Sequence, residues 1–340
     1  MMSGSGVYRG AVRPSRVPFR PAALLSATLL LGAVGLLTAC GDEPEGRQPQ
    51  VGAPPAATPS PPTTSATPSP GPSPTGATGN GAEWPNADTT GVEPGVRLTK
   101  RTGQIFVKKS GTVIQNIDLL GDVRIEANNV TVRNVRIRNP SSGGPTYWGI
   151  LQWEGYKGLV VEHVDIIGST KEEMTKGIDN LGGMVTVRYS DISGISKKAI
   201  DTQHGLIENN YLHDPHHFPQ ADGEVDMIRV TGGPAKGLKL VVRNNTIINT
   251  LGGTAAMGIY SDTNNPCHDI LFEHNFLGGG GYTLYAGGQD DPTYNLVIKD
   301  NVFSTKVKPG FGPAIFFNGK GRGNVWRNNK WQSGRTVPVP

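Results

Sequence analysis

The sequence predicts an all-β fold in which the chain winds into a solenoid of about eight to nine coils. A segment that alternates apolar and polar residues like a β-strand occurs nine times, from TVIQNIDLL to GNVWRNNKW, at intervals of 18 to 35 residues. The fourth residues of these segments alternate in charge from the second segment to the eighth: Gln115, Arg133, Glu162, Arg188, Glu208, Arg243, Glu273, Lys299 and Arg327. Two residues later lies an asparagine column: Asn210, Asn245, Asn275, Asn301 and Asn329. Strands stacked about 4.8 Å apart would set each charge between opposite charges and let the asparagines hydrogen-bond to one another.

Residues 1–39 are predicted to be a signal peptide. Four arginines precede an uncharged run of 17 residues from Pro21 to Leu37, which is short for a membrane span. The run ends in the letters LTAC, and this ending resembles the signal of bacterial lipoproteins. The resemblance implies that Cys40 is lipidated, becomes the mature N-terminus and anchors the protein in the membrane at the bacterial cell surface. The alternative is an ordinary signal peptide; a lipidated Cys40 leaves Cys267 without a disulfide partner.

Residues 40–84 are predicted to be a disordered linker, and residues 85–340 to form the solenoid domain. The linker is dominated by Pro, Thr, Ser, Ala and Gly, which cannot bury a core, and it could reach on the order of 100 Å. Four of the 32 basic residues precede Cys40, which leaves 28 basic against 28 acidic residues in the rest of the chain. This balance gives no indication of a nucleic-acid partner, and we expect an exported monomer.

A second strand follows in most coils, with the segments WGIL, KGID, KAID, DMIR, MGIY, YTLY and PAIF. Together the repeats resemble the right-handed parallel β-helix superfamily, the pectate-lyase-like proteins, over residues 112–331. The resemblance implies a right-handed solenoid that binds chain-like ligands along an outer sheet. That superfamily includes lyases, hydrolases, epimerases and adhesins, so the fold does not decide the activity.

The outward positions of the second strands form two predicted columns. One is Trp148, Lys176, Lys198, Asp226, Met257 and Tyr282, and the other is Leu151, Asp179, Asp201, Arg229, Tyr260 and Tyr285. Charged residues occupy three adjacent coils and aromatic rings flank them, an arrangement suited to a polysaccharide site. The predicted catalytic residues are Lys198, Asp201, His216, Asp226, Arg229 and Tyr260, and the predicted substrate-binding residues are Trp148, Lys176, Tyr282 and Tyr285. The alternative is a structural charge ladder in which Lys198 pairs with Asp226 and Asp201 with Arg229.

The segment HDPHHFPQADGEVD, from His213 to Asp226, lies in the longest interval of the repeat. We expect this loop to lie over the charge cluster, where a lid or catalytic wall would be. It could hold zinc, or act as an acid–base site through His213, Asp214 or His216, or be a solvated loop. A calcium site would instead use carboxylates from neighbouring coils, namely Asp179, Asp201 and Asp226.

The letters YLHDPH, from Tyr211 to His216, resemble the Tyr-x-x-Asp-Pro-His pattern of mannuronan C5-epimerases. The resemblance implies that Tyr211, Asp214 and His216 serve proton transfer at C5 of a uronic acid. In those enzymes the pattern lies on the strand that lines the groove, whereas here it spans a first strand and the following loop.

The sequence therefore predicts an exported, membrane-anchored protein that acts on an extracellular acidic polysaccharide, with β-elimination as the favoured reaction. Arg229, with calcium if the site holds it, would neutralise a carboxylate. Lys198 or His216 would remove the proton, and Tyr260 would supply one. The alternatives are a glycoside hydrolase or a uronate C5-epimerase on the same groove, and a non-catalytic glycan-binding or wall-associated module.

Overall fold

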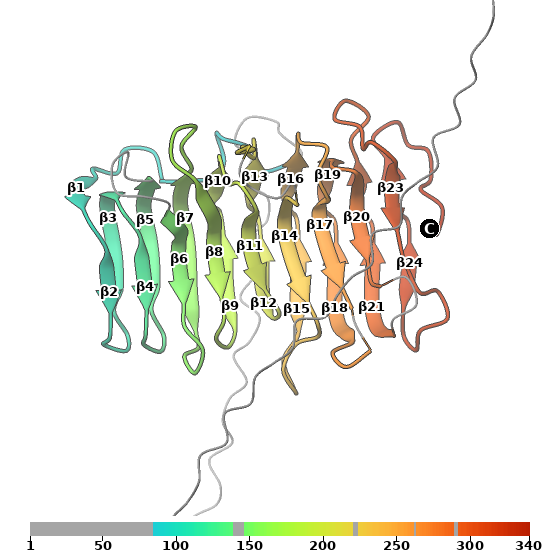
Figure 1. Cartoon of the computed structure of the whole chain (residues 1–340), viewed down its shortest axis with the longest axis horizontal. Helices are drawn as coiled ribbons and strands as arrows, with labels where there is room; N and C mark the ends of the chain where they lie inside the picture. The colour runs from blue at the N-terminus through green and yellow to red at the C-terminus, as the bar shows by residue number, and fades with distance from the viewer. Residues whose placement is uncertain (1–83, 139–145, 220–223, 262, 289–291) are drawn as a thin grey trace, which may run out of the picture. The chain divides into compact units, whose positions relative to one another are not determined.

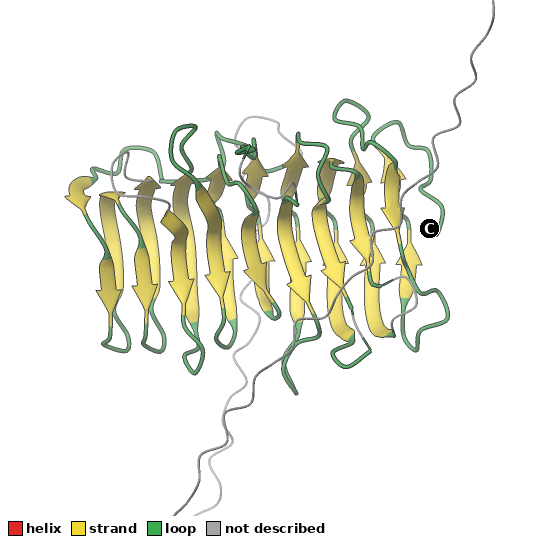
Figure 2. Ribbon diagram, viewed as in Figure 1, coloured by secondary structure: helices red, strands yellow, loops and turns green. Residues whose placement is uncertain are grey.

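The structure, a computed structural model, describes residues 84–138, 146–219, 224–261, 263–288 and 292–340. The predicted signal peptide, Cys40 and all of the predicted linker except its last residue lie outside this part. The described chain folds into strands joined by turns and loops, without a helix (Figure 2). None of these residues forms a helix long and apolar enough to cross a membrane.

The strands form two parallel sheets, here called sheet A and sheet B, and the chain visits them in turn, so that it forms a solenoid (Figure 1). Sheet A has 16 strands: β1 (Thr99–Thr102), β3 (Val113–Leu120), β5 (Thr131–Arg138), β7 (Leu159–Ile167), β9 (Val185–Arg188), β10 (Asp191–Ser193), β12 (Gly205–Glu208), β13 (Tyr211–His213), β15 (Leu240–Arg243), β16 (Thr246–Asn249), β18 (Cys267–Glu273), β19 (Phe276–Gly279), β21 (Thr293–Lys299), β22 (Val302–Phe303), β24 (Val325–Arg327) and β25 (Lys330–Trp331). Sheet B has nine: β2 (Ile105–Val107), β4 (Val123–Ile125), β6 (Thr146–Gln152), β8 (Met174–Asn180), β11 (Lys198–Thr202), β14 (Asp226–Thr231), β17 (Ala255–Tyr260), β20 (Tyr282–Ala286) and β23 (Gly312–Ile315). The prediction of an all-β solenoid is confirmed.

Sheet A bends at one residue per coil, and this residue has a positive φ. These residues are Asn116, Asn134, His163, Tyr189, Asn209, Asn244, His274, Asp300 and Asn328. Each directly follows the charged position of the repeat, and six of the nine are Asn or Asp, which tolerate the left-handed region best among residues with a side chain. Strands β3, β5 and β7 run through the bend, whereas the later coils divide there into two short strands.

The predicted asparagine ladder lies just inside this bend and is confirmed. The Nδ2 atom of Asn210 donates to Oδ1 of Asn245 at 2.9 Å, and Asn245 donates to Asn275 at 3.0 Å. The pattern continues at 3.0 Å through Asn301 to Asn329, and all five side chains are fully buried. Hydrogen bonds along the stack thus satisfy amides that would otherwise be costly in an apolar interior.

The predicted charge column on the outer face is also confirmed from the second segment to the eighth. Its residues pair in register from strand to strand. Arg188 contacts Glu162 at 2.6 Å, and Lys299 contacts Glu273 at 2.7 Å. Inside the solenoid, valine, isoleucine and leucine side chains form one continuous core, and burial of each stabilises the fold by roughly 1.5–3 kcal/mol.

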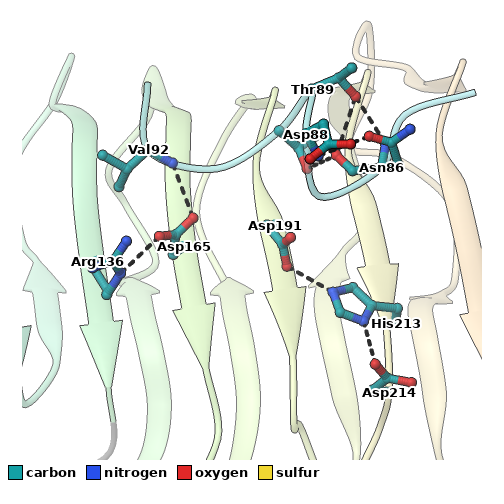
Figure 3. Close-up of polar contacts among 10 residues, drawn as sticks. Asn86, Asp88, Thr89, Val92, Arg136, Asp165, Asp191, His213 and Asp214 are labelled. Carbon is teal, nitrogen blue, oxygen red and sulfur yellow. Dashed lines mark hydrogen bonds and ion pairs between the residues drawn. The ribbon is translucent and has the colours of Figure 1, made fainter. Parts of the chain in front are cut away.

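Residues 84–96, here called the N-terminal strap, cross the outer face of sheet A before the chain enters β1. The ring of Trp84 lies 4.7 Å from that of His274. Further along, Gly91 N donates to the carbonyl of Tyr189 at 2.8 Å, and Val92 N donates to Oδ1 of Asp165 at 3.0 Å (Figure 3). Gly91 has a φ of +79° and is packed so closely on Asp165 that a Cβ would collide with it. The strap is therefore fixed to several coils.

Candidate functional site

The outward residues of sheet B bring the predicted charged residues together on strands β8, β11 and β14. One column runs Trp148, Lys176, Lys198, Asp226, and the other runs Leu151, Asp179, Asp201, Arg229. Both columns follow the predicted register through these coils, because the segments KGID, KAID and DMIR have the same length and the same apolar centre.

The predicted register is wrong by two residues in the next strand, β17. Ala255, not Met257, pairs with Asp226, and Met257 faces the core, where it is fully buried. Tyr260 correspondingly pairs with Thr231. The polarity of MGIY matches that of KAID, which leads to the wrong register. The strand pairs through the letters AAMG instead, so that the small residues Ala255 and Gly258 occupy the outward positions.

The ring of Tyr260 nevertheless occupies the place that the sequence predicts. Gly258 holds the position between Arg229 and Tyr285 in the column, and a Cβ on Gly258 would lie only 2.4 Å from the Tyr260 ring. The ring therefore folds back over the glycine. It lies 4.7 Å from the Arg229 guanidinium and 5.7 Å from the ring of Tyr285.

Lys176 links two of the predicted carboxylates. Its Nζ lies 2.9 Å from Oδ2 of Asp179 and 2.8 Å from Oδ2 of Asp201. Burial lowers the pKa of Lys176, but the hydrogen bonds to Asp201 and Asp179 outweigh this effect and raise it overall. Trp148 Nε1 also donates to Oδ2 of Asp179 at 2.7 Å, so this buried carboxylate has two donors.

The predicted metal ligands do not form a recognisable metal site in the described part of the chain. There, no group of three or more His, Cys, Asp or Glu residues could hold a metal ion. Asp179 and Asp201 share Lys176, and Asp226 accepts a hydrogen bond from Tyr260. Neither the zinc hypothesis nor the calcium hypothesis gains support from this geometry.

Asp226 is the most strongly perturbed carboxyl of the site. Burial raises its pKa from 3.8 to about 6, although hydrogen bonding to Tyr260 and attraction to Arg229 oppose the rise. The Tyr260 hydroxyl donates to Oδ1 of Asp226 at 2.9 Å, and Arg229 Nη1 lies 3.4 Å from Oδ2. Burial and the neighbouring carboxylate raise the pKa of Tyr260 far above its usual range, so Tyr260 stays protonated.

Lys198 is the least tightly paired cation of the site. Its closest acidic contact is Oδ2 of Asp201, at 3.7 Å. Burial is the main cause that lowers the pKa of Lys198; the attraction of Asp201 opposes it, and repulsion from Arg229 and Lys176 adds to it. A lowered lysine pKa increases the fraction of neutral amine, the form that can accept a proton.

The ion pairs differ from those of the structural alternative, but they leave each charge of the cluster with an opposite neighbour. Asp201 pairs with Lys176 and Lys198 rather than with Arg229. Arg229 pairs with Asp226, which belongs to its own strand, and with Glu224 at 3.6 Å.

The histidine loop contributes less to this site than the sequence predicts. His216 packs edge-on against Phe218, with ring centroids 4.8 Å apart, and its backbone N donates to the carbonyl of Ile195. Among the described residues, no hydrogen bond, ion pair or ring contact joins His216 to Asp201, Asp226 or Arg229, so its predicted catalytic role has no geometric support. Residues 220–223 of the loop lie outside the described part.

His213 and Tyr211 lie on sheet A rather than on the groove strand. His213 bridges Asp191, at 2.9 Å, and Asp214, at 2.8 Å, and its ring stacks on that of Tyr211 (Figure 3). Burial lowers the pKa of His213, but the hydrogen bonds to Asp191 and Asp214 outweigh this effect and raise it. Of the epimerase-like pattern, Tyr211 therefore lies on sheet A, away from the strands of the charge cluster, and Asp214 and His216 lie in the loop that follows β13.

Two features beside the charge cluster are not predicted from the sequence. A cavity of about 170 Å³ adjoins Asp179 and Asp201 and is lined by the buried His204, whose Nε2 lies 2.8 Å from the carbonyl of Gly182. On the other side, Phe311 and Phe316 extend the predicted row of tyrosine rings. The signals in the sequence are that Phe311 lies two residues before the segment PAIF and that Phe316 is its last residue.

No family model, curated protein or solved structure matches this chain.

Proposed function

We propose that this protein is a right-handed parallel β-helix of about eight to nine coils, of the pectate-lyase-like kind. We further propose that it binds an acidic polysaccharide along the outer face of sheet B and cleaves it by β-elimination. Parallel sheets that the chain visits coil by coil support the architecture. The charge cluster on β8, β11 and β14, with rings on both sides, supports an acidic chain-like ligand.

Three residues have the properties that β-elimination needs. Arg229 neutralises the carboxylate of a uronic acid, which acidifies the proton on C5. Lys198 takes that proton, the electron pair forms the C4–C5 double bond, and the bond from C4 to the leaving oxygen breaks. Tyr260 gives its proton to the leaving oxygen, which departs as a hydroxyl group.

The observation that carries this proposal is the environment of Lys198. The lowered pKa of Lys198 suits a general base, and its causes include Arg229, the residue proposed to bind the substrate carboxylate. Arg229 in turn lies over the ring of Tyr260, so the three proposed groups belong to one cluster on neighbouring strands.

A second candidate is a glycoside hydrolase, which the raised pKa of Asp226 favours. A carboxyl with a pKa of about 6 can act as a general acid, and Asp201 on the neighbouring strand would be the second carboxyl group of such an enzyme. Hydrolysis consumes water and gives saturated products, whereas elimination leaves an unsaturated uronate that absorbs ultraviolet light. The products therefore distinguish the two reactions.

A screen of the purified protein on polyuronates, mixed acidic polysaccharides and neutral polysaccharides tests the proposal. We expect unsaturated products from an acidic polymer, and a loss of rate of about 100-fold or more in Arg229→Ala and Lys198→Met. Arg243→Met, on the outer face of sheet A, is the matched control and should keep full activity.

New reducing ends without ultraviolet absorbance would mean that the reaction is hydrolysis and not elimination. A protein that binds acidic polymers but leaves all of them intact would be a non-catalytic binding module. A protein that neither binds nor cleaves any polymer of the screen would refute the proposed function.

A further inference from the structure

Five aromatic rings form one continuous cluster on the C-terminal half of sheet B and the turns beside β23. Tyr260 lies 5.7 Å from Tyr285, Tyr285 lies 5.7 Å from Tyr282, and Tyr282 lies 5.6 Å from Phe311. Phe316 lies 6.0 Å from Tyr285 on another side. We call these five residues the aromatic platform; with strands about 4.8 Å apart, it extends about 10 Å from β17 to β23.

Phe316 adopts a backbone conformation that its side chain disfavours. Its φ is +66°, and the other residues with a side chain and a positive φ in the described chain are Asn, Asp, His or Tyr. A bulky apolar residue in this region costs on the order of 1–3 kcal/mol, and such strain gathers at functional sites. Phe316 thus places an aromatic ring against Tyr285 at a backbone position that asparagine would adopt more easily.

Phe311 is the most exposed large apolar residue of the described chain, with 78% of its surface accessible. Its backbone N donates to the carbonyl of Gly281, and its ring lies over this glycine, where a Cβ would come within 3.3 Å. The backbone is thus held in place while the ring remains open to solvent. An exposed ring on a fixed backbone is suited to stack on the apolar face of a sugar.

The platform differs from the charge cluster in the charge it offers. The outward positions of β17, β20 and β23 carry only uncharged residues: alanine, glycine, tyrosine and isoleucine. Those of β8, β11 and β14 carry the cations Lys176, Lys198 and Arg229 together with the acids Asp179, Asp201 and Asp226. Of the described cations, only Arg229 lies over a ring of the platform, at its edge with the cluster. A carboxylate over the other rings would lose water without gaining a cation and would face the negative side of each ring.

We infer that the aromatic platform binds neutral sugar residues, so that the ligand is a mixed polysaccharide in which neutral residues separate the acidic ones. This inference rests on the proposed function, since the acidic residue of the same chain lies at Arg229. The neutral residues that follow it stack on Tyr285, Tyr282 and Phe311.

The test compares the affinity of the full-length protein for two probes. Gellan carries glucuronates separated by neutral sugars, and polygalacturonate carries a carboxylate on every residue. Phe311→Ser should weaken gellan binding about five- to tenfold and change polygalacturonate binding less than twofold. Phe316→Asn should weaken gellan binding similarly while Tm stays unchanged or rises, because asparagine accepts a positive φ.

Two controls make the test specific. Tyr294→Ser removes a ring from the outer face of sheet A and should leave both affinities unchanged. Lys306 and Lys308 lie in the exposed loop before Phe311, and replacing both with serine should change gellan binding less than Phe311→Ser does.

The inference fails if Phe311→Ser and Phe316→Asn bind gellan like the wild type, or if they weaken polygalacturonate binding equally. It also fails if the two lysines matter more than the rings, which would mean that carboxylates bind there. If no polymer is cleaved but Phe311→Ser still weakens gellan binding, the lyase proposal fails and the platform stands. If cleavage depends on Arg229 but not on Phe311, only the platform fails.

Discussion

Asp226 shows at the scale of one residue what it costs to place a carboxyl in this site. Its side chain is 1% exposed, and the rise of its pKa from 3.8 to about 6 corresponds to an ionisation cost on the order of 3 kcal/mol. Arg229 and Tyr260 offset only part of the cost of burial. A carboxyl that is held at the expense of stability is more typical of a functional role than of a structural ion pair.

This cost predicts how stability depends on pH. The folded pKa of Asp226 lies above the unfolded value, so the folded state binds the extra proton, and the stability due to this group falls as pH rises from about 4 to about 6. In Asp226→Asn this fall is absent, so the variant gains stability relative to the wild type by up to about 3 kcal/mol between pH 4 and pH 7.

Urea denaturation of both proteins at about pH 4.5 and about pH 7.5 measures this difference. Glu154→Gln, at an exposed position, is the control. A difference between Asp226→Asn and the wild type that stays constant with pH would mean that Asp226 is ionised as readily in the folded chain as in the unfolded one.

At the scale of the strand and its bend, two polar ladders of different character follow the same repeat. The asparagine ladder is fully buried, whereas the charge ladder two residues earlier is exposed to solvent on its cationic side. Buried amides must find partners, while exposed ion pairs contribute only up to about 1 kcal/mol each. The asparagines should therefore matter more for stability than the charges.

A matched pair of variants in one coil tests this difference. Asn245→Leu removes the acceptor for both the backbone N and the Nδ2 of Asn210, and it should lower the free energy of unfolding by about 2–4 kcal/mol. Arg243→Met breaks only the ion pair with Glu208 and should cost less than about 1 kcal/mol. Chemical denaturation of the two variants measures the costs; equal costs would contradict the ranking.

The elements also show where sequence reasoning succeeds and where it fails. Period and polarity predict the strands, both ladders and the charged columns, because these depend on residues that repeat in every coil. The predicted register of β17 is wrong because Gly258 has no side chain to mark the outward column. The polarity pattern instead assigns Met257 and Tyr260 to the outward positions. The positive-φ column, with Asn209 and Asn244 among its members, has a partial signal in the sequence, because Asn or Asp occupies six of its nine positions.

At the scale of the whole molecule, the loops are the least predictable part of the site. The sequence places His216 near Arg229 because the longest insertion follows β13, but the length of a loop does not fix its direction. Phe311 lies in the turn before β23, and Phe316 ends the segment PAIF just after β23; the strand pattern does not show that their rings meet Tyr282 and Tyr285. Loop contacts of this kind depend on packing, which periodicity does not encode.

The predicted lipid anchor concerns the whole molecule and lies outside the described residues. Its basis is the ending LTAC at the close of the apolar run. Cys40→Ser should move the protein from the membrane fraction to the medium and remove the mass of the lipid. Cys267→Ser is the control, because Cys267 is buried in the solenoid, and should leave the protein in the membrane fraction. Mass spectrometry that finds the wild type unlipidated and soluble would contradict the anchor.

The N-terminal strap determines how a mechanical load would enter the domain. A tension applied at Trp84 does not act first on the first coil, because the ring of Trp84 packs on His274, which lies between β18 and β19. From there the chain runs back along sheet A to β1. The contacts at Tyr189 and Asp165 lie on other coils, so the load passes through several coils before it reaches β1. A domain dragged by a long polymer while tethered at this side would thus lose its strap before any coil unwinds.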